Sequence, residues 1–118
     1  MSTTLVHNAL ADFSFNSDDR AKLDTLDWPS IARQTEVAVG GALHAIQAMR
    51  PHFEATGGGS VVTIGSNLVQ NPVVPYHDYT AAKAALMAFT RTASKDLGPL
   101  GVRVNMVAGG LLRTTDAS

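Results

Sequence analysis

The chemistry that this sequence could perform centres on Tyr79 and Lys83, which lie four residues apart in the stretch YHDYTAAKAAL. Residues at this spacing share one face of a helix, one turn from each other. A lysine ammonium held there favours the phenolate, so we expect Lys83 to lower the pKa of Tyr79 from its reference value of about 10. A tyrosine tuned in this way serves as a general acid or base. Tyr76 lies outside the predicted helix, and we expect it to pack in a proline-bounded loop.

Ser66, Asn8 and Gly109 each follow a short segment with strand character. In parallel α/β sheets, ligands bind at the carboxyl ends of the strands. We therefore expect the three residues to open into one crevice, where Ser66 would hydrogen-bond a carbonyl group that Tyr79 protonates. Taken singly, each also has a purely structural interpretation as a turn, cap or strand-end residue.

These residues are positioned by strands and helices that alternate along the chain. The predicted strands are 4–7, 61–64 and 102–107, and the main predicted helices are 31–49 and 80–97. Pro51 is expected to interrupt the first helix or to start a new one. Strands that alternate with helices of this length indicate βαβ units, a parallel sheet and the α/β class.

Composition excludes several classes of function. The chain has 118 residues, which predicts one domain, and its net charge of -1 comes from 9 basic and 10 acidic residues that are well mixed. This balance argues against nucleic acid and anionic membranes as partners. No apolar run reaches the ~18 residues that span a bilayer. The chain has no cysteine, which is consistent with a cytoplasmic protein.

A metal site and a phosphate loop are also disfavoured. The four histidines form no HExxH motif and no close pair, so we expect them to be ordinary surface or core residues. The glycine run 57–59 leads into a strand instead of opening a helix, which is the wrong context for a phosphate-binding loop. We interpret it as a turn.

Together these pieces resemble the short-chain dehydrogenase/reductase family. That family pairs Tyr-x-x-x-Lys with a serine about thirteen residues upstream, and Ser66 precedes Tyr79 by thirteen. NAL at 8–10 is similar to the end of the family's Asn-Asn-Ala-Gly segment, and VRVNMVAGG at 102–110 to its Val-Asn-x-Val-x-Pro-Gly segment. Within the family, TIGSNLVQNPVVPYHDYTAAKAAL looks most like the 3-oxoacyl-[acyl-carrier-protein] reductase-like members.

The resemblance implies a role for each matched residue. Tyr79 would be the general acid in carbonyl reduction, Lys83 would bind the nicotinamide ribose and lower the tyrosine pKa, and Ser66 would orient the carbonyl. The implied cofactor is NADP or NAD, with NADP favoured, and the implied substrate is a small carbonyl compound or acyl thioester. The implied cofactor-binding residues are Asn8, Ala9, Tyr79, Lys83, Gly109 and Gly110.

The same resemblance implies an incomplete three-layer Rossmann-like sheet. Its family order is 3-2-1-4-5-6-7, and residues 1–118 would be a single partial domain that holds strands four to six. The dinucleotide-binding turn Thr-Gly-x-x-x-Gly-x-Gly would lie before residue 1, and strand 4–7 would be an edge. Ala38 stands where the family often has asparagine, and Ala108 where it has proline.

Two main hypotheses follow, an NAD(P)H-dependent reductase and a non-catalytic truncated fragment that acts as an association module. In either case we expect a homo-oligomer through helices 31–49 and 80–97. The small residues that suit close helix contact are Gly40, Gly41, Ala81, Ala84, Ala85 and Ala88. An unrelated α/β binding protein is the third alternative, and it leaves the spacing of Ser66, Tyr79 and Lys83 unexplained.

Overall fold

The computed structural model describes residues 3–8, 11, 13 and 15–109. Within them, β1 (Thr4–His7), β2 (Gly59–Ser66) and β3 (Val102–Gly109) form one parallel sheet in the order β1-β2-β3. The predicted α/β class is therefore confirmed, and β1 lies at an edge of the described sheet as expected. β2 and β3 extend further than predicted because the glycine and serine residues beside the apolar run of β2 also join the ladder.

The helix predicted at 31–49 is part of a longer helical segment. It consists of α1 (Trp28–Thr35), a π-helical turn η2 (Glu36–Gly40) and α2 (Gly41–Thr56). Pro51 does not interrupt it, contrary to our prediction, and lies inside α2. The proline is on the exposed side of the helix, where water can satisfy the carbonyl that loses its donor.

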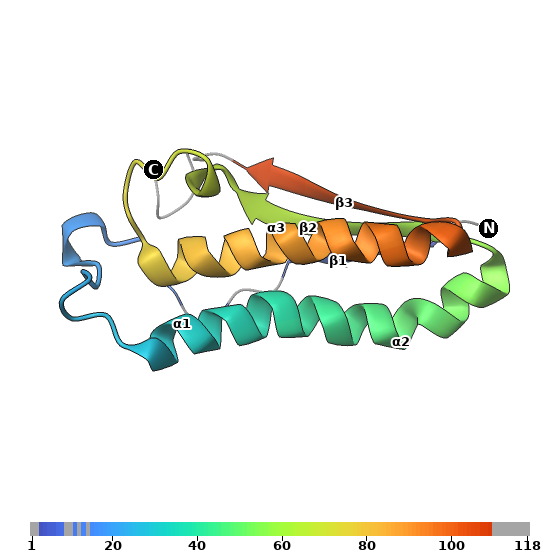
Figure 1. The fold of residues 1–118 in the computed structure, drawn as a ribbon, viewed down its shortest axis with the longest axis horizontal. Coiled ribbons are helices and arrows are strands. Elements are labelled where there is room, and N and C mark those ends of the chain that lie inside the picture. Colours follow the sequence, from blue (N-terminus) through green and yellow to red (C-terminus); the bar gives the residue numbers. More distant parts are fainter. Residues whose placement is uncertain (1–2, 9–10, 12, 14, 110–118) are drawn as a thin grey trace.

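The second long helix, α3 (His77–Leu97), lies between β2 and β3 in the chain and begins three residues before the predicted start. Three short 3₁₀ turns complete the described elements: η1 (Ser17–Asp19), η3 (Asn67–Val69) and η4 (Gly98–Leu100). Figure 1 shows the helices on one face of the sheet. The carboxyl ends of β2 and β3 lie at the same end of the molecule as the first turns of α1 and α3.

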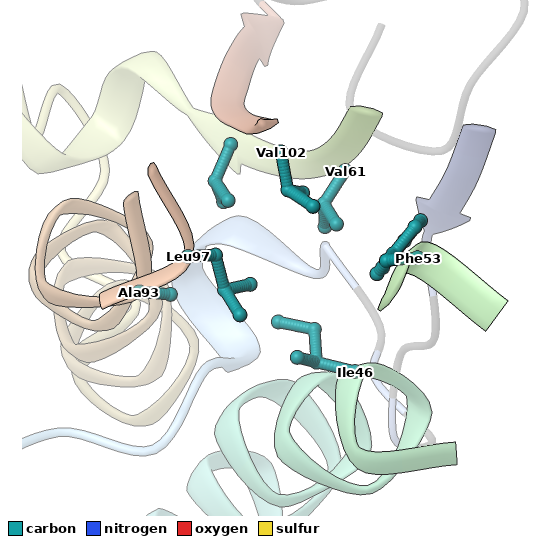
Figure 2. Close-up of a cluster of buried hydrophobic side chains, with 7 residues drawn as sticks. Ile46, Phe53, Val61, Ala93, Leu97 and Val102 are labelled. Atoms are coloured by element: carbon teal, nitrogen blue, oxygen red, sulfur yellow. The ribbon is translucent and has the colours of Figure 1, made fainter. Parts of the chain in front are cut away.

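The main hydrophobic core lies between the sheet and the two long helices (Figure 2). Phe53 from α2 and Val61 from β2 are fully buried. Burial of side chains of this size contributes ~1.5–3 kcal/mol each to the free energy of unfolding. The cluster consists of Ile46, Phe53, Val61, Ala93, Leu97, Val102 and Val104.

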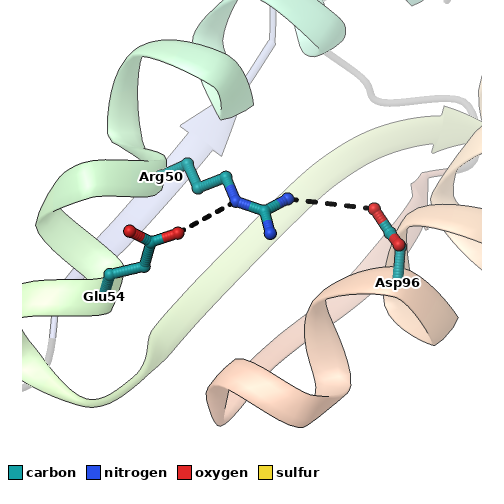
Figure 3. Close-up of polar contacts among 3 residues, drawn as sticks. All are labelled: Arg50, Glu54 and Asp96. Atoms are coloured by element: carbon teal, nitrogen blue, oxygen red, sulfur yellow. Dashed lines mark hydrogen bonds and ion pairs between the residues drawn. The ribbon is translucent and has the colours of Figure 1, made fainter.

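At the end of the molecule away from the strand carboxyl ends, Arg50 forms one ion pair within α2 and one with α3 (Figure 3). The Nε atom of Arg50 lies 3.1 Å from Oε1 of Glu54, and its NH1 atom lies 4.0 Å from Oδ2 of Asp96. All three side chains are substantially exposed, so each pair contributes at most about 1 kcal/mol to stability.

Candidate active site

Ser66, Tyr79 and Lys83 lie close to one another at the carboxyl end of β2. Ser66 is the last residue of β2, and Tyr79 and Lys83 occupy the first two turns of α3, as the four-residue spacing predicts. All three are buried, with exposed fractions of 8%, 9% and 5% respectively. The Ser66 Oγ atom accepts a hydrogen bond from the N–H of Leu68 at 3.2 Å, and the Ser66 hydroxyl is close enough to Tyr79 to favour its phenolate.

The pKa of Tyr79 differs from our expectation. Burial raises it above its ordinary value, and the hydrogen bond from Ser66 offsets only part of that effect. The Lys83 Nζ atom lies 5.8 Å from the centre of the tyrosine ring. The net shift of the Tyr79 pKa is therefore upward, not downward as we expected, and Tyr79 is a protonated phenol at neutral pH.

Lys83 is held by a backbone carbonyl. Its Nζ atom donates to the oxygen of Ile64 at 2.8 Å, which fixes the ammonium against β2. Burial lowers the pKa of this ammonium below its ordinary value. Because an ammonium has three donors and one is used by Ile64, two remain for a ligand that carries hydroxyl groups.

Two of the predicted cofactor-binding residues, Asn8 and Gly109, lie at strand ends in the structure. Gly109 is the register partner of Ser66 on β3, and it is exposed. Asn8 is also exposed and follows His7, which pairs with Thr63 on β2, so it lies beside the strand that ends in Ser66. The structure thus places Asn8 and Gly109 at the carboxyl end of the sheet, on the two strands that flank β2. Ala9 and Gly110 lie outside the described residues.

His7 makes a buried contact with the helical layer. Its Nε2 atom lies 2.8 Å from the carbonyl oxygen of Ala38, to which it donates, and Ala38 belongs to the π-helical turn η2. A Cβ atom added to Gly41 would come within 2.9 Å of the His7 ring. The prediction of an ordinary core histidine fits this contact. Gly41 packs against that ring, although we had counted it among residues suited to helix–helix assembly.

Sequence reasoning missed an aromatic cluster beside Tyr79. Phe13 stacks on the tyrosine ring with centroids 4.9 Å apart and planes 22° apart, and Phe15 meets it nearly edge-on at 5.2 Å. Tyr76 is buried and contacts both phenylalanines at 5.3 and 5.5 Å. The available signal was the Phe-x-Phe pattern that follows the end of the first predicted strand.

Other kinds of site are absent from the part of the chain that the structure describes. In residues 3–8, 11, 13 and 15–109, no three His, Asp or Glu side chains gather closely enough to hold a metal ion. Across the same residues, none of the helices combines the length and the apolar character needed to span a bilayer.

The sequence and the fold match known oxidoreductases. A protein-family model described as enoyl-(acyl carrier protein) reductase matches residues 4–118. The 7alpha-hydroxysteroid dehydrogenase of Escherichia coli (strain K12) is 31% identical over 121 aligned positions that cover 91% of this chain and 47% of the relative.

Two solved structures carry the same fold. A short-chain dehydrogenase from Streptomyces avermitilis has a TM-score of 0.79 at 26% identity and covers 96% of this chain and 40% of its own. A 7 alpha-hydroxysteroid dehydrogenase in complex with NADH and 7-oxo glycochenodeoxycholic acid has a TM-score of 0.73 at 29% identity, with 90% and 39% covered.

The match covers nearly all of this chain but only part of each relative. The chain spans between 25% and 47% of the length of the first curated relatives that it matches. What those relatives bind or convert is therefore a property of longer proteins, and its transfer to this chain requires a separate argument.

Proposed function

The chain belongs to the short-chain dehydrogenase/reductase family, and from that premise we propose that it reduces a carbonyl group to a hydroxyl at Ser66, Tyr79 and Lys83. The observation that carries the proposal is the buried, protonated hydroxyl of Tyr79, which lies beside Ser66 at the carboxyl end of a parallel strand. A phenol in this setting is suited to give up its proton to an oxygen atom that becomes negatively charged.

The proposed reaction assigns one proton and one hydrogen bond to this chain. A nicotinamide cofactor, when bound, would supply the hydride that the carbonyl carbon accepts. Tyr79 donates its phenolic proton to the carbonyl oxygen, which completes the alcohol. Ser66 donates a hydrogen bond to the same oxygen and holds the carbonyl beside the phenol. The positive charge of Lys83 stabilises the phenolate that remains on Tyr79.

The donor set at Lys83 fits the sugar hydroxyls of a nicotinamide cofactor. One ammonium donor is used by the Ile64 carbonyl at 2.8 Å, and that bond directs the other two away from β2. Asn8 and Gly109, both exposed at strand ends, would line the rest of the cofactor cleft together with Ala9 and Gly110. We propose NADP as the first cofactor to test, with NAD as the alternative.

Two kinds of substrate agree with this chemistry. The sequence resemblance implied a 3-oxoacyl thioester, and the description of the matching family model also names an enzyme that acts on acyl groups. A relative and a solved neighbour are named as hydroxysteroid dehydrogenases, which suggests a ketone on a ring system as the second candidate substrate. Both compounds carry a ketone, and the proposal depends only on that group.

The deciding experiment is a titration of the 118-residue chain with NADPH and with NADH, followed by nicotinamide fluorescence. We expect saturable binding at micromolar cofactor, then turnover of a ketone that is lost in Tyr79→Phe, which keeps the ring and removes the proton donor. No binding of either cofactor at millimolar concentration would contradict the reductase proposal. It would favour the non-catalytic alternative, in which the chain serves for association.

We also propose that the chain forms a homo-oligomer through α2 and α3. Leu43 on α2 is exposed, as are Ala81 and Ala88 on α3, which leaves small and apolar groups on the outer surface of both helices. Multi-angle light scattering should give at least twice the monomer mass of 12.4 kDa. A mass equal to the monomer at 100 µM chain would contradict this proposal.

A further inference from the structure

The candidate active site has an aromatic border that its chemistry does not require. The chain has one tryptophan, two tyrosines and four phenylalanines, and four of these residues form one cluster that consists of Phe13, Phe15, Tyr76 and Tyr79. Phe13 and Phe15 come from the segment between β1 and α1, and we call these two residues the aromatic wall. Their own rings meet at 4.9 Å with planes 82° apart, so each ring supports the other.

The aromatic wall is held in place by Tyr76. The hydroxyl of Tyr76 accepts a hydrogen bond from the backbone N–H of Ser17 at 3.0 Å, and its ring contacts both phenylalanines. Ser17 has a φ of +50°, which is unfavourable for a residue with a side chain, so the contact with Tyr76 offsets a local conformational cost. Tyr76 is therefore a positioning residue for the wall.

The aromatic wall offers ring surface and no polar group. The Tyr76 hydroxyl accepts from the Ser17 N–H and belongs to a buried side chain, and the proposed reaction uses the Tyr79 hydroxyl for the carbonyl. A carbonyl oxygen that accepts from Tyr79 brings its neighbouring carbon atoms next to the rings that flank that tyrosine. Apolar groups gain from this contact. Groups that carry charge or many hydroxyls would lose hydration without a replacement partner.

A rigid ring gains more from such a wall than an open chain does. A flexible acyl chain must give up rotational freedom to lie along an aromatic face, whereas a fused ring has little such freedom to lose. We propose that Phe13 and Phe15 make this site select ketones carried on a flat, apolar ring system over open-chain 3-oxoacyl thioesters. This inference rests on the proposed reductase function and specifies its substrate class.

The test compares two probes by ligand-observed NMR titration of the 118-residue chain: 2-decalone, a fused-ring ketone, and S-acetoacetyl-N-acetylcysteamine, an open-chain 3-oxoacyl thioester. We expect 2-decalone to bind at least tenfold more tightly. Phe13→Leu and Phe15→Leu keep an apolar side chain but remove the ring, and each should weaken 2-decalone by about tenfold while leaving the thioester within twofold. Trp28→Leu is the matched control, because Trp28 is 72% exposed and lies outside the wall.

Each outcome decides one of the two proposals. Equal or tighter binding of the thioester, or unchanged 2-decalone affinity in a phenylalanine variant whose circular dichroism spectrum matches wild type, would overturn the substrate inference. Turnover of the thioester without 2-decalone binding would leave the reductase proposal standing and overturn this one. Ring-dependent binding of 2-decalone without binding of NADPH or NADH would overturn the reductase proposal and leave the preference for ring ketones standing.

Discussion

The side chain of Tyr79 is buried, and burial disfavours its phenolate more strongly than the neighbouring Ser66 hydroxyl favours it, which raises the pKa of Tyr79. In the proposed reaction the tyrosine would therefore act as an acid. A residue that holds its proton at neutral pH can protonate the ketone oxygen during reduction, whereas oxidation of the alcohol would require the rare phenolate. The proposed site would thus favour the reductive direction at neutral pH.

The pH dependence of the two directions should differ. Because the pKa of Tyr79 is raised above 10, ionisation of this residue should cause no loss of reduction rate between about pH 6 and pH 9. Oxidation should rise by about tenfold per pH unit over the same range, since the phenolate fraction does. Initial rates in both directions would check this. An oxidation rate that levels off below pH 9 would show that the pKa is lowered instead.

Replacement of Lys83 by an apolar residue should weaken cofactor binding and raise the thermal stability of the fold. The pKa of Lys83 is lowered from 10.5 by burial, so folding disfavours its charged form. Between the folded pKa and 10.5 the unfolded chain binds more protons, and wild-type stability rises with pH in that window. At pH values below the folded pKa, burial of the Lys83 charge destabilises the fold to its full extent. We expect Lys83→Met to raise Tm at pH 7 by about 3 °C or more, and the difference from wild type to shrink as pH approaches 10.5.

The matched control for this prediction is Lys95→Met, which makes the same change at an exposed position of α3. Its Tm should stay within about 1 °C of wild type at both pH values. A lower Tm for Lys83→Met at pH 7 would mean that the bond to the Ile64 carbonyl stabilises the fold more than burial of the charge destabilises it. Cofactor binding should weaken in Lys83→Met alone.

At the scale of elements, the π-helical turn η2 determines how the helical layer meets the sheet. The turn brings the Ala38 carbonyl to His7 at the end of β1, 2.8 Å from its ring nitrogen. The glycine that follows, Gly41, leaves room for that ring. The sheet and the helical layer therefore meet here through the His7 ring and the Ala38 carbonyl, and the lack of a side chain on Gly41 makes room for that ring.

The two adjacent glycines at this turn should respond to alanine in opposite directions. Both have helical backbone angles, with φ of -61°. A Cβ on Gly41 would lie 2.9 Å from the His7 ring, so Gly41→Ala should destabilise the fold by ~1–3 kcal/mol. A Cβ on Gly40 would come no closer than 3.8 Å to the side chain of Glu36, so Gly40→Ala should stabilise it by ~0.5–1 kcal/mol. Urea unfolding of both variants checks the pair. Equal effects would show that the histidine ring moves aside freely.

The elements that could be predicted from the sequence are those with a regular period. The alternation in 102–107 and the helical spacing of Tyr79 and Lys83 gave the sheet, the long helix and the core of the site. The extra residue in η2 could not be predicted, because a π turn has no pattern distinct from an α-helix. Phe13 and Phe15 were missed because a loop has no period that tells which face its side chains present.

The direction of the Tyr79 pKa shift could not be predicted from the sequence for a related reason. The four-residue spacing fixed the proximity of a cation but said nothing about burial, which came from the helical layer and from a loop about sixty residues away in the chain. The net direction of the pKa shift could be determined only once the surroundings of Tyr79 were known.

For the molecule as a whole, the helices cover one face of the described sheet (Figure 1). Strand alternation places Val6 and Val107 on the other face, because Leu5, Val102 and Val104 belong to the core beneath the helices. Val6 on β1 is 59% exposed and Val107 on β3 is 56% exposed. We expect this face to bind the dye anilinonaphthalene sulfonate, and the double change Val6→Thr with Val107→Thr to reduce its fluorescence by about half. Val73→Thr removes an equally exposed valine from a loop and should have no effect. Unchanged fluorescence in the double variant would place the dye elsewhere.

The parallel register also has a kinetic consequence. Thr4 pairs with Ser60 and Gly59 pairs with Val102, so no two neighbouring strands are close in the chain. Each pairing must close a loop that contains a helical segment, and topologies dominated by such distant contacts fold slowly. β1 has four residues in the ladder and the longer loop to close, so we expect it to join last. Until it does, the edge of β2 is open to other chains, and the refolding yield should fall as the concentration rises.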